Sequence, residues 1–291
     1  MVGYFPQNNT NTIANKQEVC GNTIPQSVDL LLNQFEPITL DEMDKVKLMN
    51  RIDTKFLISQ EQLPCLLNKA LSQYRIVEID NLRALPYSSI YFDTQDSEMY
   101  TMHHNGKLNR YKIRMRTYLS SNTSFLEIKR KSNKGRTKKK RIKIANEQFQ
   151  RVSLEKDGQD FIRERSPYNY NFLRPSLQNF FYRITLVDKD ETERITVDFD
   201  LKFRSVGIQS YLDTNGLVIV EMKQDSTTNS HFRTYLNDMS VLPKGLSKYC
   251  LGMIMTDSRV KTNRLKKKIR YINKLTSQST FLSFPKEKVF G

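Results

Sequence analysis

Charged residues recur at every second position in seven segments of the sequence. Between residues 112 and 116, Lys112, Arg114 and Arg116 alternate with Ile113 and Met115. Alternate side chains of a β-strand share one face, so each segment, folded as a strand, would present an ionic face. The same alternation groups Arg51, Asp53, Lys55, Glu127, Lys129, Lys131, Lys139, Arg141, Lys143, Arg183, Arg194, Thr196, Asp198, Asp200, Glu221 and Lys223.

Faces so dense in arginine and lysine suit an anionic chain. Arginine grips phosphate oxygens in pairs and lysine acts as a point charge, while the few carboxylates suit a divalent metal that bridges phosphate oxygens. If the strands closed into a barrel with these faces inward, the bore would be a basic, water-filled tunnel. The alternative is an ordinary antiparallel sheet with one solvated face. That alternative explains any single strand better than it explains all seven.

Length and composition fit a soluble globular protein of one large domain or two small ones. The chain has 291 residues, 38% hydrophobic and 27% charged, with a mean hydropathy of −0.60. It contains no apolar run of the ~20 residues that a membrane-spanning helix needs and shows no secretory signal, so we expect a cytoplasmic protein. The three cysteines are far apart and fit reduced, mostly structural thiols.

The net charge of +16 is concentrated in two segments. Residues 129–143 contain ten basic residues and no acidic one, and residues 258–291 contain ten basic residues against Glu287 alone. The remainder carries 27 basic and 30 acidic residues, a net charge of −3. So local an excess indicates an anionic partner. The second segment fits solvated surface equally well, or a binding site for nucleic acid or another polyanion.

The predicted fold class is α+β: an antiparallel barrel of eight to nine strands with helices packed outside. Capping boxes at Thr39–Glu42 and Ser59–Gln62 predict helix starts, the first helix extending to Leu48 and the second ending near residue 73. Residues 1–27 lack an apolar period and are expected to form a disordered arm; 28–257 would be the tunnel domain and 258–291 a basic tail, helical or disordered. The predicted strands span residues 50–58, 74–79, 87–93, 109–119, 124–131, 137–145, 180–187, 194–202 and 217–223. Further helices are predicted over residues 148–165, 231–239 and 248–255.

Common catalytic signatures are absent from the sequence. It contains no phosphate-binding GxxxxGK[ST] loop, no GxGxxG, no HExxH and no GxSxG. With only three histidines, a histidine-based mechanism is not expected. The tyrosines and phenylalanines sit mostly on the apolar parity, which predicts a role in the core.

Eight short motifs occur in order between residues 50 and 255. They are RxDxKF (51–56), YFD (91–93), YKIRMR (111–116), FLEIKRK (125–131), FYR (181–183), RITVDFDL (194–201), VIVEMK (218–223) and SKYCLG (247–252). Together they resemble the VTC domain family, which belongs to the triphosphate tunnel metalloenzymes (CYTH-like). The resemblance implies a tunnel that binds triphosphate or polyphosphate with Mn²⁺ or Mg²⁺. It also implies a polyphosphate polymerase, a transferase that uses ATP.

The resemblance also implies roles for individual residues. Phosphate ligands would be Lys55, Arg114, Arg116, Lys129, Arg183 and Lys248, with Lys139 or Arg141 on the following strand; Glu221 would bind the metal. The shared ionic face adds Arg51, Lys131, Arg194 and Lys223 as phosphate-binding candidates, and Glu127 and Asp198 as metal-binding candidates. The catalytic set would be Arg114, Arg116, Lys129, Arg183 and Glu221.

Two alternatives stay open. The wider superfamily carries ExExK on the first strand where this chain has RxDxK, which favours a polymerase acting on ATP and pyrophosphate or polyphosphate. An inorganic or nucleoside triphosphatase would use the same tunnel, with water as the acceptor. A non-catalytic protein that binds polyphosphate or nucleic acid is the second alternative.

Overall fold

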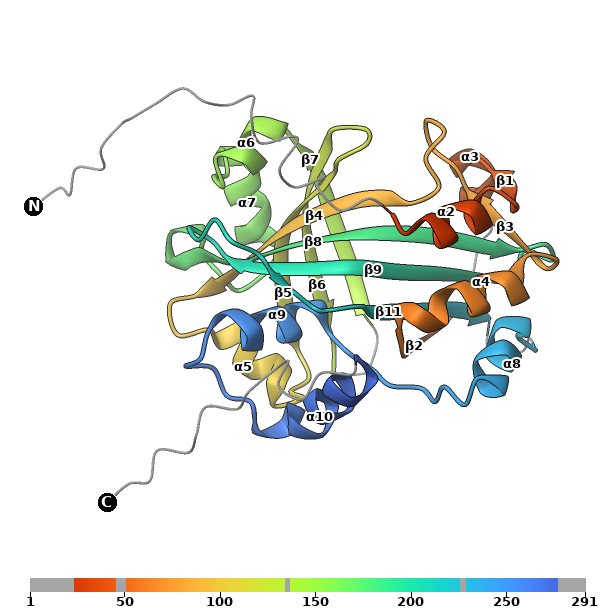
Figure 1. Cartoon of the computed structure of the whole chain (residues 1–291). Helices are drawn as coiled ribbons and strands as arrows, with labels where there is room; N and C mark the ends of the chain where they lie inside the picture. The colour runs from red at the N-terminus through yellow and green to blue at the C-terminus, as the bar shows by residue number, and fades with distance from the viewer. Residues whose placement is uncertain (1–23, 46–50, 134–136, 226–228, 277–291) are drawn as a thin grey trace, which may run out of the picture.

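A computed structural model describes residues 24–45, 51–133, 137–225 and 229–276 (Figure 1). Its strands are β1 (Glu36–Ile38), β2 (Arg51–Ser59), β3 (Tyr74–Val77), β4 (Leu85–Thr94), β5 (Arg110–Tyr118), β6 (Thr123–Lys131), β7 (Thr137–Ile144), β8 (Leu173–Asp188), β9 (Glu193–Ser205), β10 (Leu212–Asp213) and β11 (Leu217–Asp225). Its helices are α2 (Gln26–Leu32), α3 (Leu40–Lys45), α4 (Leu63–Ala70), α5 (Glu98–His104), α6 (Asn146–Gln150), α7 (Lys156–Arg165), α8 (His231–Asp238), α9 (Lys248–Thr256) and α10 (Lys266–Leu275). All nine predicted strands are present, so the α+β class is confirmed.

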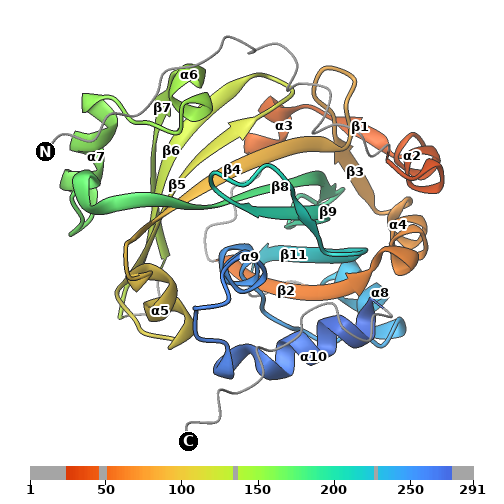
Figure 2. The same cartoon turned by 60° about the vertical axis from the view of Figure 1, so that its left-hand side comes forward.

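The strands form one large sheet whose main path runs β2-β11-β9-β8-β4-β5-β6-β7. Every neighbouring pair on this path is antiparallel. The short strand β3 pairs with β8, and β1 pairs in parallel with β3. The sheet curves, and Figure 2 shows α9 between β5, β6 and β7 on one side and β2 and β11 on the other.

The predicted closure of the barrel is not found in the part of the chain that the structure describes. The path ends at β2 and at β7, and no pairing joins these two strands. The physical reason lies at β2, where the backbone carbonyl of Lys55 accepts a hydrogen bond of 2.7 Å from the backbone N–H of Lys244. The segment before α9 therefore occupies a position on β2 that a closing strand would need.

The face of the sheet opposite the ionic residues is apolar and covered by helices, as predicted. Under α2, α4 and α8, the side chains of β2, β8, β9 and β11 form one core cluster that includes Phe56, Val197 and Val220. Under α6 and α7, those of β4, β5 and β6 form another, which includes Met115 and Leu126. The alternating pattern therefore places this face correctly along most of the sheet.

The ionic face is not ionic along its whole length, which corrects the prediction of a water-filled bore. At one end its side chains are apolar, including Leu57, Ile219 and Phe203, and pack with Tyr249 and Leu251 of α9. The close approach of α9 depends on Gly252, because a Cβ atom there would lie 2.5 Å from side-chain atoms of Leu177 and Phe203. Helix α9 therefore fills one end of the concave face.

A bulge in β9 reverses the predicted orientation of Asp200. The residue has φ = 49°. The pairing of β8 with β9 shifts register between Phe180 and Tyr182. Before the bulge Phe199 packs in the outer cluster, whereas Leu201 packs under α9. Because strict alternation is lost there, Asp200 lies beside Lys202, at 3.3 Å, rather than with Asp198.

The helix starts are predicted better than the helix lengths. Both capping boxes form: Thr39 exchanges hydrogen bonds with Glu42, and Ser59 with Gln62. The single helix predicted over residues 148–165 is two helices, since Val152 between them has φ = 54°. The predicted extension to Leu48, most of the arm at 1–27 and the end of the tail lie outside the described residues. The boundaries at 28 and 257 stay predictions.

Candidate functional site

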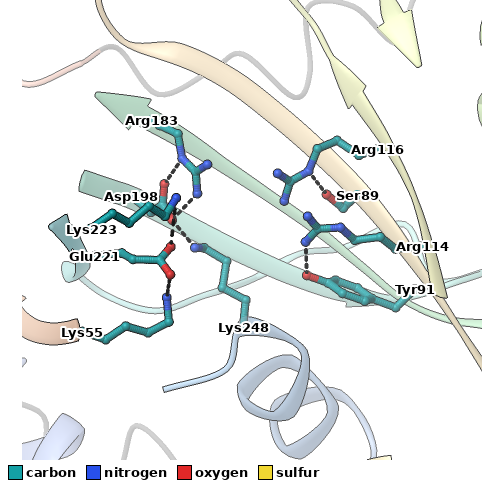
Figure 3. A network of polar contacts seen from close by, with 10 residues as sticks. All are labelled: Lys55, Ser89, Tyr91, Arg114, Arg116, Arg183, Asp198, Glu221, Lys223 and Lys248. Carbon is teal, nitrogen blue, oxygen red and sulfur yellow. Dashed lines mark hydrogen bonds and ion pairs between the residues drawn. The ribbon is translucent and has the colours of Figure 1, made fainter. Parts of the chain in front are cut away.

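Two groups of basic side chains face each other across the concave face (Figure 3). One comes from β5 and includes Arg114 and Arg116, and the other contains Lys55, Arg183 and Lys248 from β2, β8 and the first residue of α9. The strand register brings together residues from four sequence regions. The ionic end of the concave face is thus one site with two basic walls.

The first wall is organised by Glu127, which is completely buried. Arg114 lies directly opposite it on β5 and Arg141 directly opposite it on β7. Arg114 donates hydrogen bonds to Glu127 from Nε at 2.8 Å and from Nη2 at 2.6 Å, and Lys139 forms an ion pair with the other carboxylate oxygen. Burial raises the pKa of Glu127, but these cations and Arg116 outweigh it and hold the pKa well below its usual range. Glu127 is therefore a permanent anion that orients its wall.

Arg116 is buried without an ion pair to any carboxylate among the described residues. Its Nε donates a hydrogen bond of 3.1 Å to the hydroxyl of Ser89, and its guanidinium lies 5.4 Å from the ring centroid of Tyr87 and 5.8 Å from that of Phe181. Burial lowers the pKa of Arg116, as does the neighbouring Arg114. A buried guanidinium without an ion pair favours the binding of an anion, because an anionic ligand would supply the missing counter-charge.

The second wall is organised by Asp198, which is 2% exposed. Arg183 donates two hydrogen bonds to it, at 2.6 and 2.8 Å, and Lys248 forms an ion pair with it. Burial raises the pKa of Asp198, but Arg183 and Lys248 outweigh it, so the carboxyl stays ionised. Lys248 opens α9, whose N-cap Ser247 accepts a hydrogen bond from the backbone N–H of Cys250. Asp198 thus connects α9 to the strand wall.

Glu221 is the least enclosed of the three carboxylates. One oxygen lies 2.5 Å from Lys55 Nζ and the other 3.9 Å from Lys223 Nζ. Burial raises its pKa, but Lys223 and Lys55 outweigh it and lower the pKa to about 2. Its second oxygen has only the long contact with Lys223, so that oxygen is available to a further cation.

Three lysines lie in one row across β5, β6 and β7. Lys129 is directly opposite Lys112 on one side and Lys139 on the other. Burial, together with Arg114 and Arg116, lowers the pKa of Lys129 to about 6, and burial lowers that of Lys112 to about 8. Like charges directly opposite each other destabilise a sheet. Such a row is costly in the unliganded protein and favourable once an anion lies along it.

The remaining predicted residues lie around this centre. Lys131, at the end of β6, lies opposite Arg110 of β5. Arg194 of β9 lies opposite Lys223 of β11. Arg51 opens β2, and its side chain is not described. Arg141 lies over the ring of Phe125, with 4.6 Å to the centroid. These residues extend the basic face away from the two walls.

Sequence reasoning missed the aromatic part of the site. Tyr87, Tyr91 and Phe181 lie under Arg114, Arg116 and Arg183, with guanidinium-to-centroid distances of 5.2 to 5.8 Å. All three are buried in the core cluster, as predicted, but they also line the ionic end of the concave face. A signal for this position exists in the sequence: Tyr87 and Tyr91 lie two residues from Ser89, and Phe181 lies two residues from Arg183, so alternation puts them on the ionic face.

The carboxylates fit a metal that arrives with phosphate better than one held by protein alone. Among the described residues no group of three or more His, Cys, Asp or Glu side chains could hold an ion. Asp198 and Glu127 each bind two cations closely through both oxygens, whereas the second oxygen of Glu221 makes only a 3.9 Å contact with Lys223, so Glu221 is the donor that fits best. Mg²⁺ commonly takes one or two carboxylates and completes its shell with phosphate oxygens and water. The residues present fit that mode.

A family model for the VTC domain matches residues 50–256, the segment that carries both walls and α9. The chain belongs to the VTC domain family. This confirms the resemblance and places the chain in the triphosphate tunnel superfamily of phosphate-handling enzymes, which are typically metal-dependent and bind nucleotide or polyphosphate. No curated protein matches the sequence.

Solved structures with a similar fold share little sequence with this VTC domain. A candidate adenylate cyclase from Bacillus halodurans has a TM-score of 0.45 at 15% identity and covers 68% of this chain and 96% of its own. HpAC1 from Hippeastrum, a candidate adenylyl cyclase described as having a dominant triphosphatase activity, has a TM-score of 0.44 at 15% identity, covering 69% and 94%. A candidate adenylate cyclase from Vibrio parahaemolyticus has a TM-score of 0.41 at 10% identity, covering 70% and 99%.

Proposed function

We propose that this VTC domain is a cytoplasmic, metal-dependent polyphosphate polymerase that transfers the γ-phosphoryl group of ATP to a growing inorganic polyphosphate chain. The observation that carries the proposal is the pair of basic walls, in which Arg116 and Lys129 have no carboxylate partner of their own among the described residues. A site built to hold only structural ion pairs would neutralise such groups. These two basic groups instead fit a ligand with several negative charges, which would pair with Arg116 and favour the charged form of Lys129.

The basic residues of the site would contribute to phosphate binding in two ways. Arg114 and Arg183 are fixed by Glu127 and Asp198, so they present phosphate with donors whose orientation is already set. Arg116 supplies charge that is compensated only when phosphate is present, and Lys129, whose pKa is lowered to about 6 by burial and its cationic neighbours, gains its charge when phosphate binds. Phosphoryl transfer needs little covalent help from the protein, because catalysis rests on positioning and charge stabilisation.

Glu221 is the residue that would hold the metal ion, beside Lys55 and Lys223. When bound, Mn²⁺ or Mg²⁺ would neutralise charge on the phosphate oxygens. Nothing in this arrangement requires a protein nucleophile. The acceptor in a polymerase is a terminal phosphate oxygen of the chain, an anion that the same basic face can bind.

The test is to incubate the full chain with ATP and Mn²⁺, then Mg²⁺, resolve products on a polyphosphate-staining gel and measure free phosphate in parallel. We expect a ladder of long chains that Lys129→Ala fails to make, with a loss of about 100-fold or more in rate. Surface variant Lys156→Ala on α7 is the matched control and should make the ladder. Phosphate release without chains would identify a triphosphatase, and tight polyphosphate binding without turnover would identify a binding protein.

A further inference from the structure

The basic face of the site continues beyond the two walls toward α10. From residue 258 to residue 276 the sequence contains eight basic residues and no acidic one. Within α10, Lys267, Arg270 and Lys274 are exposed. Their spacing of three and four residues puts them on one side of the helix. We call the surface formed by Lys267, Arg270 and Lys274 the exposed face of α10.

The opposite side of α10 is fixed to the body of the protein. Ile269 and Ile272 are buried, and Tyr271 lies under Lys244, whose Nζ is 3.8 Å from the ring centroid. The backbone of Lys244 is in turn hydrogen-bonded to Lys55 on β2. Helix α10 is therefore held next to the second wall of the site, and Figure 1 shows it beside α5 and α9.

Helix α9 lies next to both the lysine row and α10. Lys112 donates a hydrogen bond of 3.0 Å to Ser247, at the start of α9. Burial raises the pKa of the neighbouring Cys250 thiol, and the opposing charges that reach it are those of Lys112, Arg110 and Lys268. Lys112 belongs to the lysine row and Lys268 to α10. Ile272 of α10 belongs to the same buried apolar cluster as Tyr249 and Leu251 of α9, so α10 packs at the end of the concave face that α9 fills.

We propose that the exposed face of α10 is an outer binding surface for inorganic polyphosphate, holding the part of the chain that extends past the lysine row. The choice of ligand rests on the proposed function. A membrane surface is disfavoured because the apolar residues of α10 are buried, and membrane-bound helices use that face for insertion. Single-stranded nucleic acid is disfavoured because Tyr271, the aromatic residue of α10, lies under Lys244 and offers no stacking platform.

The test compares two triple variants of the full chain. Lys267→Gln, Arg270→Gln and Lys274→Gln neutralise the exposed face of α10. Lys156→Gln, Arg163→Gln and Arg165→Gln remove the same charge from α7, which also has ten residues and packs on the outside of the sheet. Circular dichroism checks that each variant keeps its helices. The probes are tripolyphosphate, as the short anion, and a polyphosphate of about 100 phosphates, titrated at several salt concentrations.

We expect the α10 variant to bind the long chain on the order of 10-fold more weakly, with a slope of log affinity against log salt that is shallower by about two. Its affinity for tripolyphosphate should be unchanged, and the α7 variant should match the wild type with both probes. The proposal is overturned if the α10 variant binds the long chain as well as wild type, or if the α7 variant loses as much. It is also overturned if single-stranded RNA of equal charge binds the α10 face as tightly as polyphosphate.

These outcomes separate the two proposals. If the wild type makes no polymer from ATP and metal, yet the α10 variant alone loses long-chain binding, the proposed function is wrong and the outer surface stands. If the wild type makes polymer and the α10 variant binds long chains normally, the outer surface is wrong and the proposed function stands.

Discussion

Arg183 donates two hydrogen bonds to Asp198, at 2.6 and 2.8 Å, and both residues are removed from most solvent contact. Both Asp198 oxygens are already occupied, since Lys248 binds one of them as well. The carboxylate therefore acts as an anchor for two cations rather than as a metal ligand. Glu221 differs, because its second oxygen makes only a 3.9 Å contact with Lys223.

Replacing Asp198 should cost stability without changing the metal requirement. Asp198→Ala leaves Arg183 and Lys248 without their anion, and losing one partner of a buried ion pair costs about 3–5 kcal/mol in the free energy of unfolding. Asp198→Asn keeps the shape and should cost less. Urea unfolding measures the first effect, and the Mn²⁺ concentration for half-maximal ATP turnover measures the second. A large rise in that concentration for Asp198→Asn would show that Asp198 binds the metal after all.

Lys129→Met should make the protein more stable and less active. Burial lowers the pKa of Lys129, as do Arg114, Arg116 and Lys139, so a charge at this position is unfavourable in the unliganded protein. Methionine has a similar length and no charge, so we expect the free energy of unfolding to rise by about 1 kcal/mol. Thermal unfolding without ligand tests this. Equal or lower stability, with the fold retained, would contradict the view that Lys129 is held for ligand binding at a cost.

The ionic faces could be predicted from the sequence because alternation is a local property. Seven strands show it, and the residues that it grouped, such as Arg114 with Arg116 and Glu221 with Lys223, do share one face of the sheet. Alternation also assigned the outer apolar face correctly. It failed at Asp200, where a bulge adds a residue that no local pattern reveals.

Other features depend on contacts between distant parts of the chain. The closure of the barrel is prevented where Lys244 binds β2, some 190 residues from Lys55 in sequence. The filling of one end by α9 rests on Gly252 meeting Leu177 and Phe203. Neither contact can be predicted from a periodic pattern in the sequence. The ion pairs of Glu127 with Arg114 and Lys139, by contrast, follow from the strand register once that register is known.

Binding of phosphate should be accompanied by uptake of protons. The unliganded pKa of Lys129 is about 6, and those of Lys223 and Lys248 are about 8. At pH 7.5 Lys129 is mostly neutral, and a phosphate ligand raises its pKa by favouring the ammonium form. Affinity for tripolyphosphate should therefore fall as pH rises from 6 toward 9.

Calorimetry measures this uptake directly. Titration of tripolyphosphate at pH 7.5 in two buffers with different ionisation enthalpies gives the number of protons bound. We expect Lys129→Met to take up fewer protons than wild type, while Lys156→Met on the exposed face of α7 should not differ. Identical uptake in wild type and Lys129→Met would mean that Lys129 is already charged before the ligand binds.

Glu221→Gln should separate metal-dependent turnover from phosphate binding. The substitution removes one negative charge from a basic site, so tripolyphosphate should bind without metal at least as tightly as it binds wild type. Turnover of ATP should fall by about 100-fold, because the carboxylate with an available oxygen is lost. Full activity at the wild-type Mn²⁺ concentration would rule out Glu221 as the metal ligand.

Gly252→Ala should weaken the site from a distance by displacing α9. The added Cβ atom would lie 2.5 Å from atoms of Leu177 and Phe203, both completely buried, so the helix must shift. Overpacking of this kind costs about 1–3 kcal/mol. The shift also moves Lys248, the first residue of α9, away from Asp198. We expect a lower melting temperature and a weaker affinity for tripolyphosphate. Gly245→Ala is the matched control, because a Cβ atom there meets nothing within 4 Å. If Gly252→Ala melts lower yet binds tripolyphosphate normally, the position of α9 does not set the second wall.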